Sequence, residues 1–410
     1  MIKIAVIGGG PAGFMAAISA AEASKNNIEI EIFEKKEPLK TILYTGGGRC
    51  NITNATFDYK KLASNYPRGE KFLYSAFSKF AVQETIDWFK THGVELYTQE
   101  DGRIFPKSND ANTVRDMFLS RAKELGIKIR AHSPVSMIEQ RQGKFYIYVD
   151  KNPVIFDKVI ISTGGNYRKL EGSGYELAKT LGHQITELKP ALTAFVTKEK
   201  WPSILAGVTV KDVEISAVFK GKLIAKDHGD LLFTHKGVSG PSIFKISSYC
   251  AFLSYSEVEP LILNFNFLSG KNPEEFEKEL LKIFDKNSKK NLSNILSDYA
   301  PRSLISVVLD TESIDHDKKP SQITKEERKK IIKLLTAATL SAKSPAPEGE
   351  IITAGGIYLD EVNPKTMESK LVKNLYFCGE ILNIDGFTGG FNLQAAWSTG
   401  YFAGINIDKA

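Results

Sequence analysis

Short apolar runs recur along the chain in the pattern of a sheet that is buried on both faces. Residues 2–7 (IKIAVI) and 158–162 (KVIIS) are apolar and rich in β-branched side chains, which is typical of parallel strands. Residues 28–33 form a second strand after a helical stretch at 14–24, and residues 375–378 form a further short strand. These runs predict an α/β fold with a parallel sheet.

Between these strands the spacing of hydrophobic residues changes to that of helices and then to that of alternating strands. Residues 82–93 and 110–126 have the spacing of amphipathic helices, and residues 127–129 follow as a strand. Residues 145–149 and 154–156 alternate enough to predict a β-ribbon.

Further along, residues 191–268 consist of many short alternating strands, which favours a small barrel or sandwich. Residues 273–340 are helical and charged, with breaks at Pro301 and Pro320. The strand pattern returns after Pro345.

We therefore predict one Rossmann-like dinucleotide-binding domain that an insertion interrupts. The discontinuous domain comprises residues 1–189 and 345–410. The insertion comprises a β-barrel-like domain at 190–271, completed by part of 335–350, and a helical cap at 272–334.

The composition is that of an ordinary globular protein, with 42% hydrophobic and 25% charged residues among 410. The net charge of +6 is mild for this length, and residues 271–333 hold 14 Lys or Arg against 12 Asp or Glu. Such interleaved charges are typical of solvated helix faces, so no dedicated nucleic-acid site is evident.

The three cysteines, Cys50, Cys250 and Cys378, are far apart and form no CxxC pair. This spacing argues against a disulfide framework, a zinc ribbon and a dithiol redox pair, and we expect no metal site. No secretory signal precedes the strand at residue 2, and no apolar run is long enough to span a bilayer. A cytoplasmic protein with no membrane partner is the simplest expectation.

The segment after the first strand, Gly8 to Gly13, fits the GxGxxG pattern of dinucleotide-binding loops. In that pattern Gly8 makes the tight turn, Gly10 lets the backbone approach a pyrophosphate, and Gly13 lets helix and strand pack closely. The helix N-terminus supplies N–H groups and a positive dipole end for the phosphates. Glu34 ends the second strand 21 residues after Gly13, where its carboxylate accepts hydrogen bonds from ribose hydroxyls. The cofactor-binding residues expected here are Gly8, Gly10, Pro11, Ala12, Gly13, Glu34 and Lys35.

An acid at that position favours an unphosphorylated ribose, so FAD or NAD rather than NADP. The segment LYFCGEILNIDGFTGGFNLQAAWSTG, residues 375–400, provides a second contact surface: a strand, an acid, and a glycine pair that opens a helix of small residues. These features suit the ribityl chain and the pyrimidine end of a flavin. The strand at 158–162 runs into a Thr-Gly-Gly turn that resembles the turn where FAD-binding folds cross beneath the cofactor. The residues expected to contact FAD here are Thr163, Gly164, Gly165, Gly379, Glu380, Asp385, Gly389, Gly390, Asn392 and Leu393.

Four motifs together carry a family resemblance: GGGPAGFMAA from residue 8, TGGGRCNITN at 45–54, LLFTHKGVSGPSIF at 231–244, and TAGGIYLDEVNPKTMESKLVKNLYFCGEILNIDGFTGGFNLQAAWSTG at 353–400. From end to end the chain resembles the bacterial FAD-binding flavoproteins of the BaiN or aminoacetone-oxidase type. The resemblance implies an FAD domain of the two-dinucleotide-binding type interrupted by a β-barrel and a helical insert, with tightly bound FAD and an oxidoreductase activity. It is a poor guide to the substrate, because members range from a reductase of unsaturated bile-acid ketones to proteins of unknown role.

In such folds the TGGGRCNITN loop lies over the middle of the cofactor. The resemblance implies that Gly46, Gly47 and Gly48 pack bare backbone against the flavin. It also implies that Arg49 offsets pyrophosphate charge or stabilises the reduced ring, and that Asn51 fixes the loop or bonds the ring edge. A glycine loop shaped only for packing is the alternative.

Arg49, Cys50 and His235 are the candidate catalytic residues. An arginine beside Cys50 favours a thiolate, whereas the lack of a resolving cysteine favours a small buried hydrophobe. His235 is a candidate proton donor above the flavin, or a residue that caps a loop. No GxSxG elbow accompanies it, so we do not predict a hydrolase.

The leading hypothesis is an FAD-dependent oxidoreductase that transfers hydride through flavin N5, with NAD(P)H as donor and an unsaturated ketone or similar small molecule as substrate. No second GxGxxG follows a strand, so NAD(P)H would bind transiently. The alternatives are an FAD oxidase of a small amine or ketone, and a flavoprotein associated with RNA or a protein partner. The oligomeric state stays open.

Overall fold

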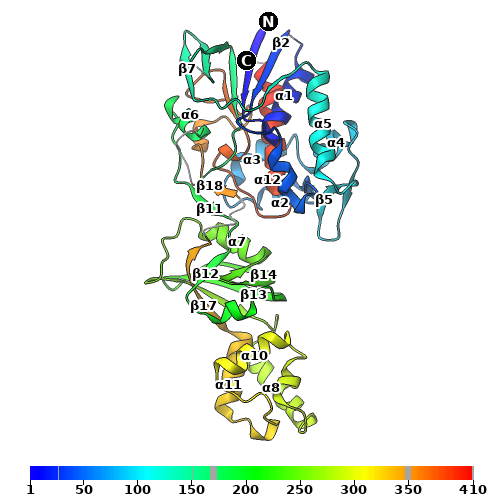
Figure 1. Cartoon of the computed structure of the whole chain (residues 1–410), viewed down its shortest axis with the longest axis vertical. Coiled ribbons are helices and arrows are strands. Elements are labelled where there is room, and N and C mark those ends of the chain that lie inside the picture. The colour runs from blue at the N-terminus through cyan, green and yellow to red at the C-terminus, as the bar shows by residue number, and fades with distance from the viewer. Residues whose placement is uncertain (26, 150, 167–172, 347–351, 409–410) are drawn as a thin grey trace. The chain divides into compact units, whose positions relative to one another are not determined.

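The chain folds into two compact units, which are described separately (Figure 1). The computed structural model describes residues 1–408 apart from 26, 150, 167–172 and 347–351. Unit 1 comprises Met1–Lys189 and Ile352–Ala410, and unit 2 comprises Pro190–Ile351. The chain returns to unit 1 at Ile352 rather than at residue 345, because the last strand of unit 2 extends to Pro345.

Unit 1 is built on a five-stranded parallel sheet with the order β19-β10-β1-β2-β6. The apolar runs of the sequence supply its central strands, as predicted, because strands covered on both faces must be apolar throughout. The strands are β1 (Ile2–Ile7), β2 (Ile28–Phe33), β6 (Lys128–Arg130), β10 (Lys158–Ile161) and β19 (Leu375–Phe377).

Helices cover one side of this sheet and an antiparallel ribbon lies on the other (Figure 1). The helices are α1 (Pro11–Ala23), α5 (Ala111–Glu124) and α12 (Phe391–Ile407). The ribbon strands are β7 (Met137–Arg141), β8 (Lys144–Tyr148) and β9 (Val154–Phe156). The predicted helices and ribbon are therefore confirmed.

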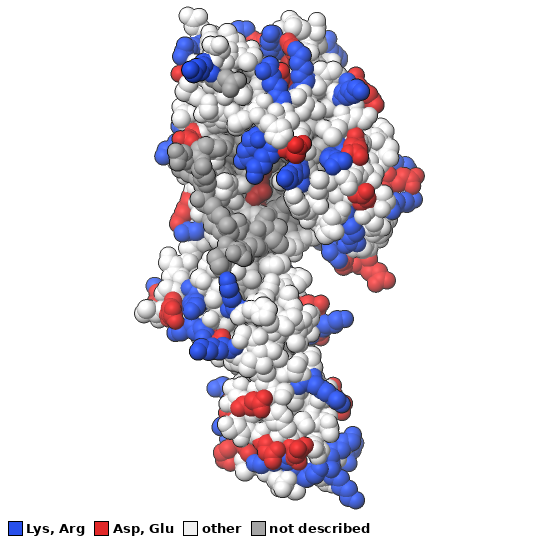
Figure 2. All heavy atoms as spheres, viewed as in Figure 1, with Lys and Arg blue, Asp and Glu red and all other residues white. Residues whose placement is uncertain are grey.

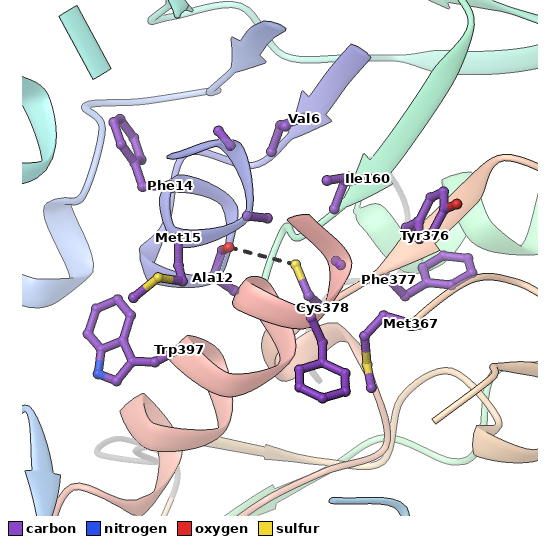
Figure 3. Packing of buried hydrophobic residues seen from close by; sticks show 14 of the residues in the cluster. Val6, Ala12, Phe14, Met15, Ile160, Met367, Tyr376, Phe377, Cys378 and Trp397 are labelled. Atoms are coloured by element: carbon purple, nitrogen blue, oxygen red, sulfur yellow. Dashed lines mark hydrogen bonds between the residues drawn. The ribbon is translucent and has the colours of Figure 1, made fainter. Parts of the chain in front are cut away.

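The first and last helices of unit 1 pack backbone to backbone (Figure 3). A Cβ atom on Gly400 would lie 2.5 Å from the carbonyl oxygen of Ala12, and one on Gly404 would lie 2.4 Å from that of Ala16. The small residues of α12 are therefore required by close helix packing. Trp397 is fully buried beside them and donates its Nε1–H to the carbonyl oxygen of Ile52 at 3.0 Å.

Smaller elements complete unit 1 around the glycine loop. A three-stranded antiparallel sheet with the order β3-β5-β4 supports that loop. The elements are η1 (Lys40–Gly47), β3 (Thr53–Asn54), α2 (Tyr59–Ala63), α3 (Glu70–Phe77), α4 (Val82–Thr91), β4 (Leu96–Thr98), β5 (Arg103–Pro106), α6 (Gly174–Thr180), β18 (Ile352–Ala354), η4 (Leu359–Glu361) and η5 (Gly379–Ile381). Strand β11 (Lys189–Ala191) begins at the last residue of this part of unit 1 and continues into unit 2.

Unit 2 contains a closed barrel with the strand order β12-β15-β14-β13-β16-β17, together with a helical segment. The barrel strands are β12 (Phe195–Thr197), β13 (Thr209–Phe219), β14 (Lys222–Thr234), β15 (Gly237–Ser239), β16 (Leu261–Asn266) and β17 (Ala338–Pro345). The other elements are η2 (Trp201–Leu205), α7 (Pro241–Cys250), α8 (Pro273–Lys286), α9 (Leu292–Leu296), α10 (Arg302–Thr311), η3 (Pro320–Gln322) and α11 (Lys325–Thr336).

The helical segment and the barrel share one hydrophobic core. Leu280 and Leu335 from the helices belong to the same buried cluster as Leu263 from the barrel. The helical pattern ends at Thr336 and not near residue 340, because the last barrel strand begins at Ala338.

Charges of both signs mix on the face drawn in Figure 2, which agrees with the interleaved charges of the sequence. Among the described residues no helix is long and apolar enough to cross a membrane. In the same part of the chain, no group of three or more His, Cys, Asp or Glu side chains is placed to hold a metal ion.

Candidate functional site

The turn between β1 and α1 contains two glycines that the protein's own packing requires. Gly8 has a φ of +107°, and a Cβ atom there would lie 2.6 Å from the carbonyl oxygen of Ser162. A Cβ atom on Gly13 would lie 2.1 Å from the carbonyl oxygen of Gly8. These contacts agree with a tight turn at Gly8 and close helix–strand packing at Gly13.

Gly10 differs from Gly8 and Gly13 because no contact with the described residues requires its small size. A Cβ atom at this position would meet no atom of those residues within 4 Å. Gly10 is also the N-cap of α1, which has no side-chain cap and carries Pro11 in its first turn. The open space therefore lies at an uncapped helix N-terminus, which is where a phosphate binds.

Glu34 ends β2 beside this turn. Its Oε2 accepts a hydrogen bond from the Gly9 N–H at 2.8 Å, and its Oε1 accepts one from the Lys36 N–H at 2.8 Å. Both bonds hold the carboxylate against the glycine turn. This is the position, at the end of the second strand, of the acidic residue that binds the ribose in dinucleotide-binding folds. Lys35 is exposed.

The glycine triplet adopts backbone conformations that favour glycine at all three positions. The φ angles are +58° for Gly46, +69° for Gly47 and +85° for Gly48. A Cβ atom on Gly46 would lie 2.7 Å from the Phe105 ring, whereas the same atom on Gly47 would meet nothing within 4 Å. Packing therefore explains Gly46, and the open backbone beyond it leaves room for a ligand.

Arg49 follows the triplet and is held in two ways. Its Nε donates to the carbonyl oxygen of Gly46 at 3.1 Å, and its guanidinium lies 4.1 Å from the centre of the Phe105 ring. Among the described residues no carboxylate pairs with it. The loop therefore presents an oriented cation that has no counter-ion within the described part of the chain.

Cys50 is fully buried and has a φ of +61°. Burial raises the pKa of its thiol to about 12, against a small opposing effect of a hydrogen bond with Thr45. At neutral pH the side chain is therefore a thiol, and the neighbouring arginine does not produce a thiolate. This environment favours the structural role over the catalytic one.

We expect a disulfide-based thiol reagent at pH 8 to label none of the three cysteines in the native protein and all three after denaturation. Cys50, Cys250 and Cys378 are free and buried. Burial raises the pKa of Cys50 and of Cys250 to about 12, and that of Cys378 also rises. Absorbance of the released thiol measures the reaction. Rapid native labelling that disappears in Cys50→Ala would restore Cys50 as a catalytic candidate.

Asn51 is a structural anchor in the loop. Its amide is oriented so that Oδ1 accepts the Gly390 N–H at 3.0 Å, while Nδ2 donates to the carbonyl oxygens of Thr53 at 3.0 Å and Ile104 at 3.1 Å. The amide therefore uses its hydrogen bonds to tie the glycine loop to the start of α12. This geometry favours the expectation that Asn51 fixes the loop.

The Thr-Gly-Gly turn after β10 contains a polar atom that lacks a partner. Thr163 Oγ1 is buried and has no hydrogen bond within the described part of the chain. Gly164 has a φ of +73°, and a Cβ atom on it would meet nothing within 4 Å. A Cβ atom on Gly165 would lie 2.5 Å from Glu380 Oε1, so this turn packs against the acid that follows β19.

Glu380 is a carboxyl group in an environment that disfavours its charge. Its Oε1 accepts the Thr353 N–H at 2.8 Å. Burial raises the pKa of Glu380 to about 7, the Thr353 hydrogen bond opposes this, and the negative charge of Asp385 adds to the rise. A carboxyl group with such a pKa holds or accepts a proton near neutral pH.

Replacing Glu380 with glutamine is expected to flatten the pH dependence of apoprotein stability. The folded pKa of about 7 lies above the ordinary 4.5. Any stability that this proton contributes is therefore complete below pH 4.5 and is lost as the pH rises to 7, by up to about 3 kcal/mol. Urea unfolding of both proteins between pH 4.5 and 7.5 measures it. Parallel curves would contradict the raised pKa.

Asp385 is fully buried and paired with Arg68. The Nε and Nη2 atoms of Arg68 donate to the two carboxylate oxygens, so the pair is bidentate. The expected contact between Asp385 and FAD stays a prediction, and sequence reasoning missed the side chain that bonds both of its oxygens. No local signal marks Arg68 as its partner, because the two residues are 317 positions apart.

The N-terminus of α12 is shaped by backbone contacts. Gly390 has a φ of +99°, and a Cβ atom there would lie 2.5 Å from the carbonyl oxygen of Thr53. Gly379 and Gly389 also have positive φ angles. Asn392 closes the preceding loop, with Nδ2 donating to the carbonyl oxygen of Gly386 at 2.8 Å. The helix has no side-chain cap, so N–H groups of its first turn, including that of Leu393, face outward for an acceptor.

His235 belongs to unit 2. It is exposed at the turn between β14 and β15. The glycines around it serve the barrel, since a Cβ atom on Gly237 would lie 2.2 Å from the carbonyl oxygen of Phe195. The structure gives His235 no hydrogen-bond partner among the described residues, and its catalytic role stays a prediction.

A buried Ser–His–Glu series in unit 1 was not foreseen from the sequence. Ser369 Oγ accepts the N–H groups of Leu371 at 3.0 Å and Val372 at 2.8 Å, so its proton is donated to His183 Nε2 at 2.9 Å. His183 Nδ1 then donates to Glu361 Oε2 at 3.0 Å. Ser369 is only 7% exposed and both lone pairs are occupied, so the series is structural and not a hydrolytic triad.

The residues present fit an FAD molecule on three observations. Gly10 leaves open space at an uncapped helix N-terminus, which suits a pyrophosphate. Thr163 Oγ1 is a buried polar atom that lacks a partner in the described structure. The start of α12 supplies a second uncapped helix end. Contact between FAD and each named residue stays a prediction.

Comparison with known proteins identifies the family. The chain matches the HI0933-like protein Rossmann domain over residues 2–406. It is 32% identical over 412 residues to the 3-dehydro-bile acid delta(4,6)-reductase of Clostridium scindens, covering 98% of each chain. It is 28% identical to the ribosomal RNA dihydrouridine synthase of Haemophilus influenzae, covering 98% of each chain. It is also 28% identical to the enzyme of the same name from Escherichia coli, covering 97% of this chain and 95% of that one. The chain therefore belongs to the HI0933-like family of FAD-dependent oxidoreductases with a Rossmann fold.

Proposed function

We propose that this protein uses NAD(P)H to reduce a carbon–carbon double bond that is conjugated to a carbonyl group. The observation that carries the proposal is the chemistry shared by relatives that match almost the whole chain. One is named as a delta(4,6)-reductase of a 3-dehydro bile acid, and two are named as dihydrouridine synthases. An oxo steroid with such alkenes and a uracil ring both contain a carbon–carbon double bond conjugated to a carbonyl.

The chain's own residues supply the binding part of this function. In the proposal, the first turn of α1 around Gly10 holds the pyrophosphate, and Glu34 holds the adenosine ribose. The first turn of α12 approaches the pyrimidine end of the flavin. When bound, FAD supplies two-electron hydride chemistry at its N5 atom.

NAD(P)H is the proposed electron donor. The sequence contains no second GxGxxG after a strand, so the nicotinamide nucleotide would bind transiently and leave after reducing the cofactor. Glu34 is proposed to bind the adenosine ribose of FAD, so it gives no preference between NADH and NADPH as the electron donor.

The substrate is either a small unsaturated ketone or a uracil base within RNA. The sequence showed no dedicated nucleic-acid site, but two relatives are named as ribosomal RNA dihydrouridine synthases, so RNA is included beside a small-molecule substrate. Both substrate classes present the same conjugated carbonyl to the flavin, so one reaction type covers them.

An anaerobic stopped-flow experiment tests the proposal. The purified holoenzyme is mixed first with NADH or NADPH, and the loss of flavin absorbance near 450 nm is followed. The reduced enzyme is then mixed with a 3-oxo-Δ4 steroid, with uridine-containing RNA, or with dissolved oxygen. Reoxidation by a conjugated carbonyl with reduction of its alkene supports the proposal. Rapid reoxidation by oxygen alone, with peroxide as product, would instead support the oxidase hypothesis.

A further inference from the structure

We propose that Arg49 binds the carbonyl oxygen of the conjugated substrate and stabilises the negative charge that develops there during reduction. This inference rests on the proposed function and gives one of its residues a distinct task. It differs from the two roles that sequence analysis considered for Arg49, which were to offset pyrophosphate charge or to stabilise the reduced ring.

The guanidinium of Arg49 is held in a defined orientation. Arg49 Nε donates to the Gly46 carbonyl oxygen at 3.1 Å, and the Phe105 ring lies beneath the group at 4.1 Å. Phe105 is fully buried on β5, so its ring provides a fixed support. A guanidinium held by one N–H and one ring face presents its two terminal nitrogens in a fixed plane, ready for a bidentate acceptor.

The terminal nitrogens of Arg49 have no acceptor in the described part of the chain. Neither terminal nitrogen of Arg49 has a hydrogen-bond or carboxylate partner among the residues that the structure describes. A carboxylate pairs with each of Arg68, Arg103, Arg115, Arg121, Arg130, Arg141 and Arg328, whereas among the described residues none pairs with Arg49 or with the exposed Arg302. Arg49 is half-buried, and an oriented, half-buried cation without a counter-ion is suited to an oxygen from outside the chain.

Hydrogen bonds attach the loop that contains Arg49 to helix α12. Asn51, two residues from Arg49, accepts the Gly390 N–H at the start of α12, and Trp397 of the same helix donates to the Ile52 carbonyl oxygen. The loop is therefore fixed to the helix end that is proposed to face the flavin. Gly47 beside Arg49 leaves open space, since a Cβ atom there would meet nothing within 4 Å.

The pyrophosphate of FAD already has a proposed binding place away from Arg49. The open position Gly10 lies at the N-terminus of α1, whose N–H groups and dipole already suit a pyrophosphate. Arg49 lies in a different loop, tied to α12 rather than to α1. A cation in this loop is therefore best explained by a second negative charge, the one that develops on the substrate oxygen.

In the proposed reaction the conjugated alkene is reduced in two steps. Hydride derived from NAD(P)H adds to the β-carbon of the substrate, and the π electrons of the alkene shift through the α-carbon to the carbonyl oxygen. Two N–H groups of Arg49 donate to this oxygen while it carries the enolate charge. A proton from water then adds to the α-carbon and the carbonyl re-forms. The alkene gains two electrons and two protons in total, and NAD(P)H is oxidised to NAD(P)⁺.

The test separates the two half-reactions in Arg49→Gln, with Arg49→Lys as the conservative variant. Arg302→Gln is the matched control, because Arg302 is an exposed arginine in unit 2. We expect Arg49→Gln to retain FAD and to be reduced by NAD(P)H within about threefold of the wild-type rate. Its reoxidation by the conjugated carbonyl should fall at least about 100-fold, as when one oxyanion donor is removed. Arg49→Lys should recover part of that loss.

A binding measurement provides a readout that does not depend on turnover. The probe is 4-nitrophenol, whose ionised oxygen resembles an enolate oxygen and whose colour reports its ionisation. Wild-type holoenzyme and Arg302→Gln should bind the phenolate form and lower the pH at which it ionises. Arg49→Gln should bind it at least about tenfold more weakly.

The outcomes distinguish this inference from the proposed function. If wild-type enzyme reduces no conjugated carbonyl, the proposed function fails. If wild-type enzyme reduces one and Arg49→Gln does so at the same rate, only the Arg49 inference is overturned. Loss of FAD from Arg49→Gln, or equal slowing of both half-reactions, would also overturn it and would return Arg49 to a cofactor-binding role.

Discussion

Replacing Gly10 with valine is expected to leave the apoprotein folded and to weaken FAD binding at least about 100-fold, or roughly 3 kcal/mol. A Cβ atom at Gly10 would meet no atom of the described residues within 4 Å. The backbone there (φ −88°, ψ −173°) is extended, which valine adopts readily. The new side chain would enter the space through which a pyrophosphate is proposed to approach the backbone. Titration of apoprotein with FAD measures the affinity, and thermal unfolding of the same apoprotein measures the fold.

Gly13→Ala is the matched control for this substitution. A Cβ atom at Gly13 would lie 2.1 Å from the carbonyl oxygen of Gly8, so even one methyl group forces backbone to move. This variant should lose thermal stability as an apoprotein, whereas Gly10→Val should not. If Gly10→Val binds FAD like the wild type, or unfolds as early as Gly13→Ala, the open position does not belong to the pyrophosphate.

Replacing Arg68 with alanine is expected to destabilise the apoprotein by about 3–5 kcal/mol, because the change leaves a buried carboxylate without its partner. The Asp385 side chain is 0% exposed and that of Arg68 is 15% exposed. The pair joins the segment before α3 to the loop before α12, where a backbone bridge also links the two residues. Urea unfolding of the apoprotein gives the free energy directly.

A second substitution shows whether the charge or the packing carries that effect. Asn at position 385 is uncharged, so Arg68→Ala combined with Asp385→Asn should recover part of the stability lost by Arg68→Ala alone. The coupling in this double-mutant cycle should exceed about 1 kcal/mol, the upper value for exposed ion pairs. A loss below that value in Arg68→Ala, with no coupling, would mean that solvent or another group replaces the arginine.

Much of unit 1 could be predicted because its signals are local. The apolar runs form strands β1 and β10, which are buried at Ile4–Ile7 and throughout Lys158–Ile161, so the local sequence reflects their burial. The spacing of Gly8, Gly10 and Gly13 predicted three separate tasks, and the structure gives the two packing tasks to Gly8 and Gly13 and leaves Gly10 open. The barrel of unit 2 was also visible in its alternating strands.

Residue roles that depend on distant partners could not be predicted in the same way. Asp385 was expected to contact FAD, which stays a prediction, and nothing near it in the sequence indicates that Arg68 binds both of its oxygens. The arginine beside Cys50 suggested a thiolate, but burial raises the pKa of the thiol to about 12. In both cases the deciding quantity was burial or a contact across the fold, which no window of sequence contains.

The sequence by itself determined the fold class, the dinucleotide turn and the family, because these depend on local spacing and on long contiguous motifs. Only the tertiary structure decided which polar groups remain available for a ligand. Asn51 is used by the start of α12, whereas Arg49 is held on Phe105 with its terminal nitrogens free of carboxylates in the described chain. The physical reason is that hydrogen-bond capacity is a property of a side chain's neighbours, and those neighbours meet only when distant segments fold together.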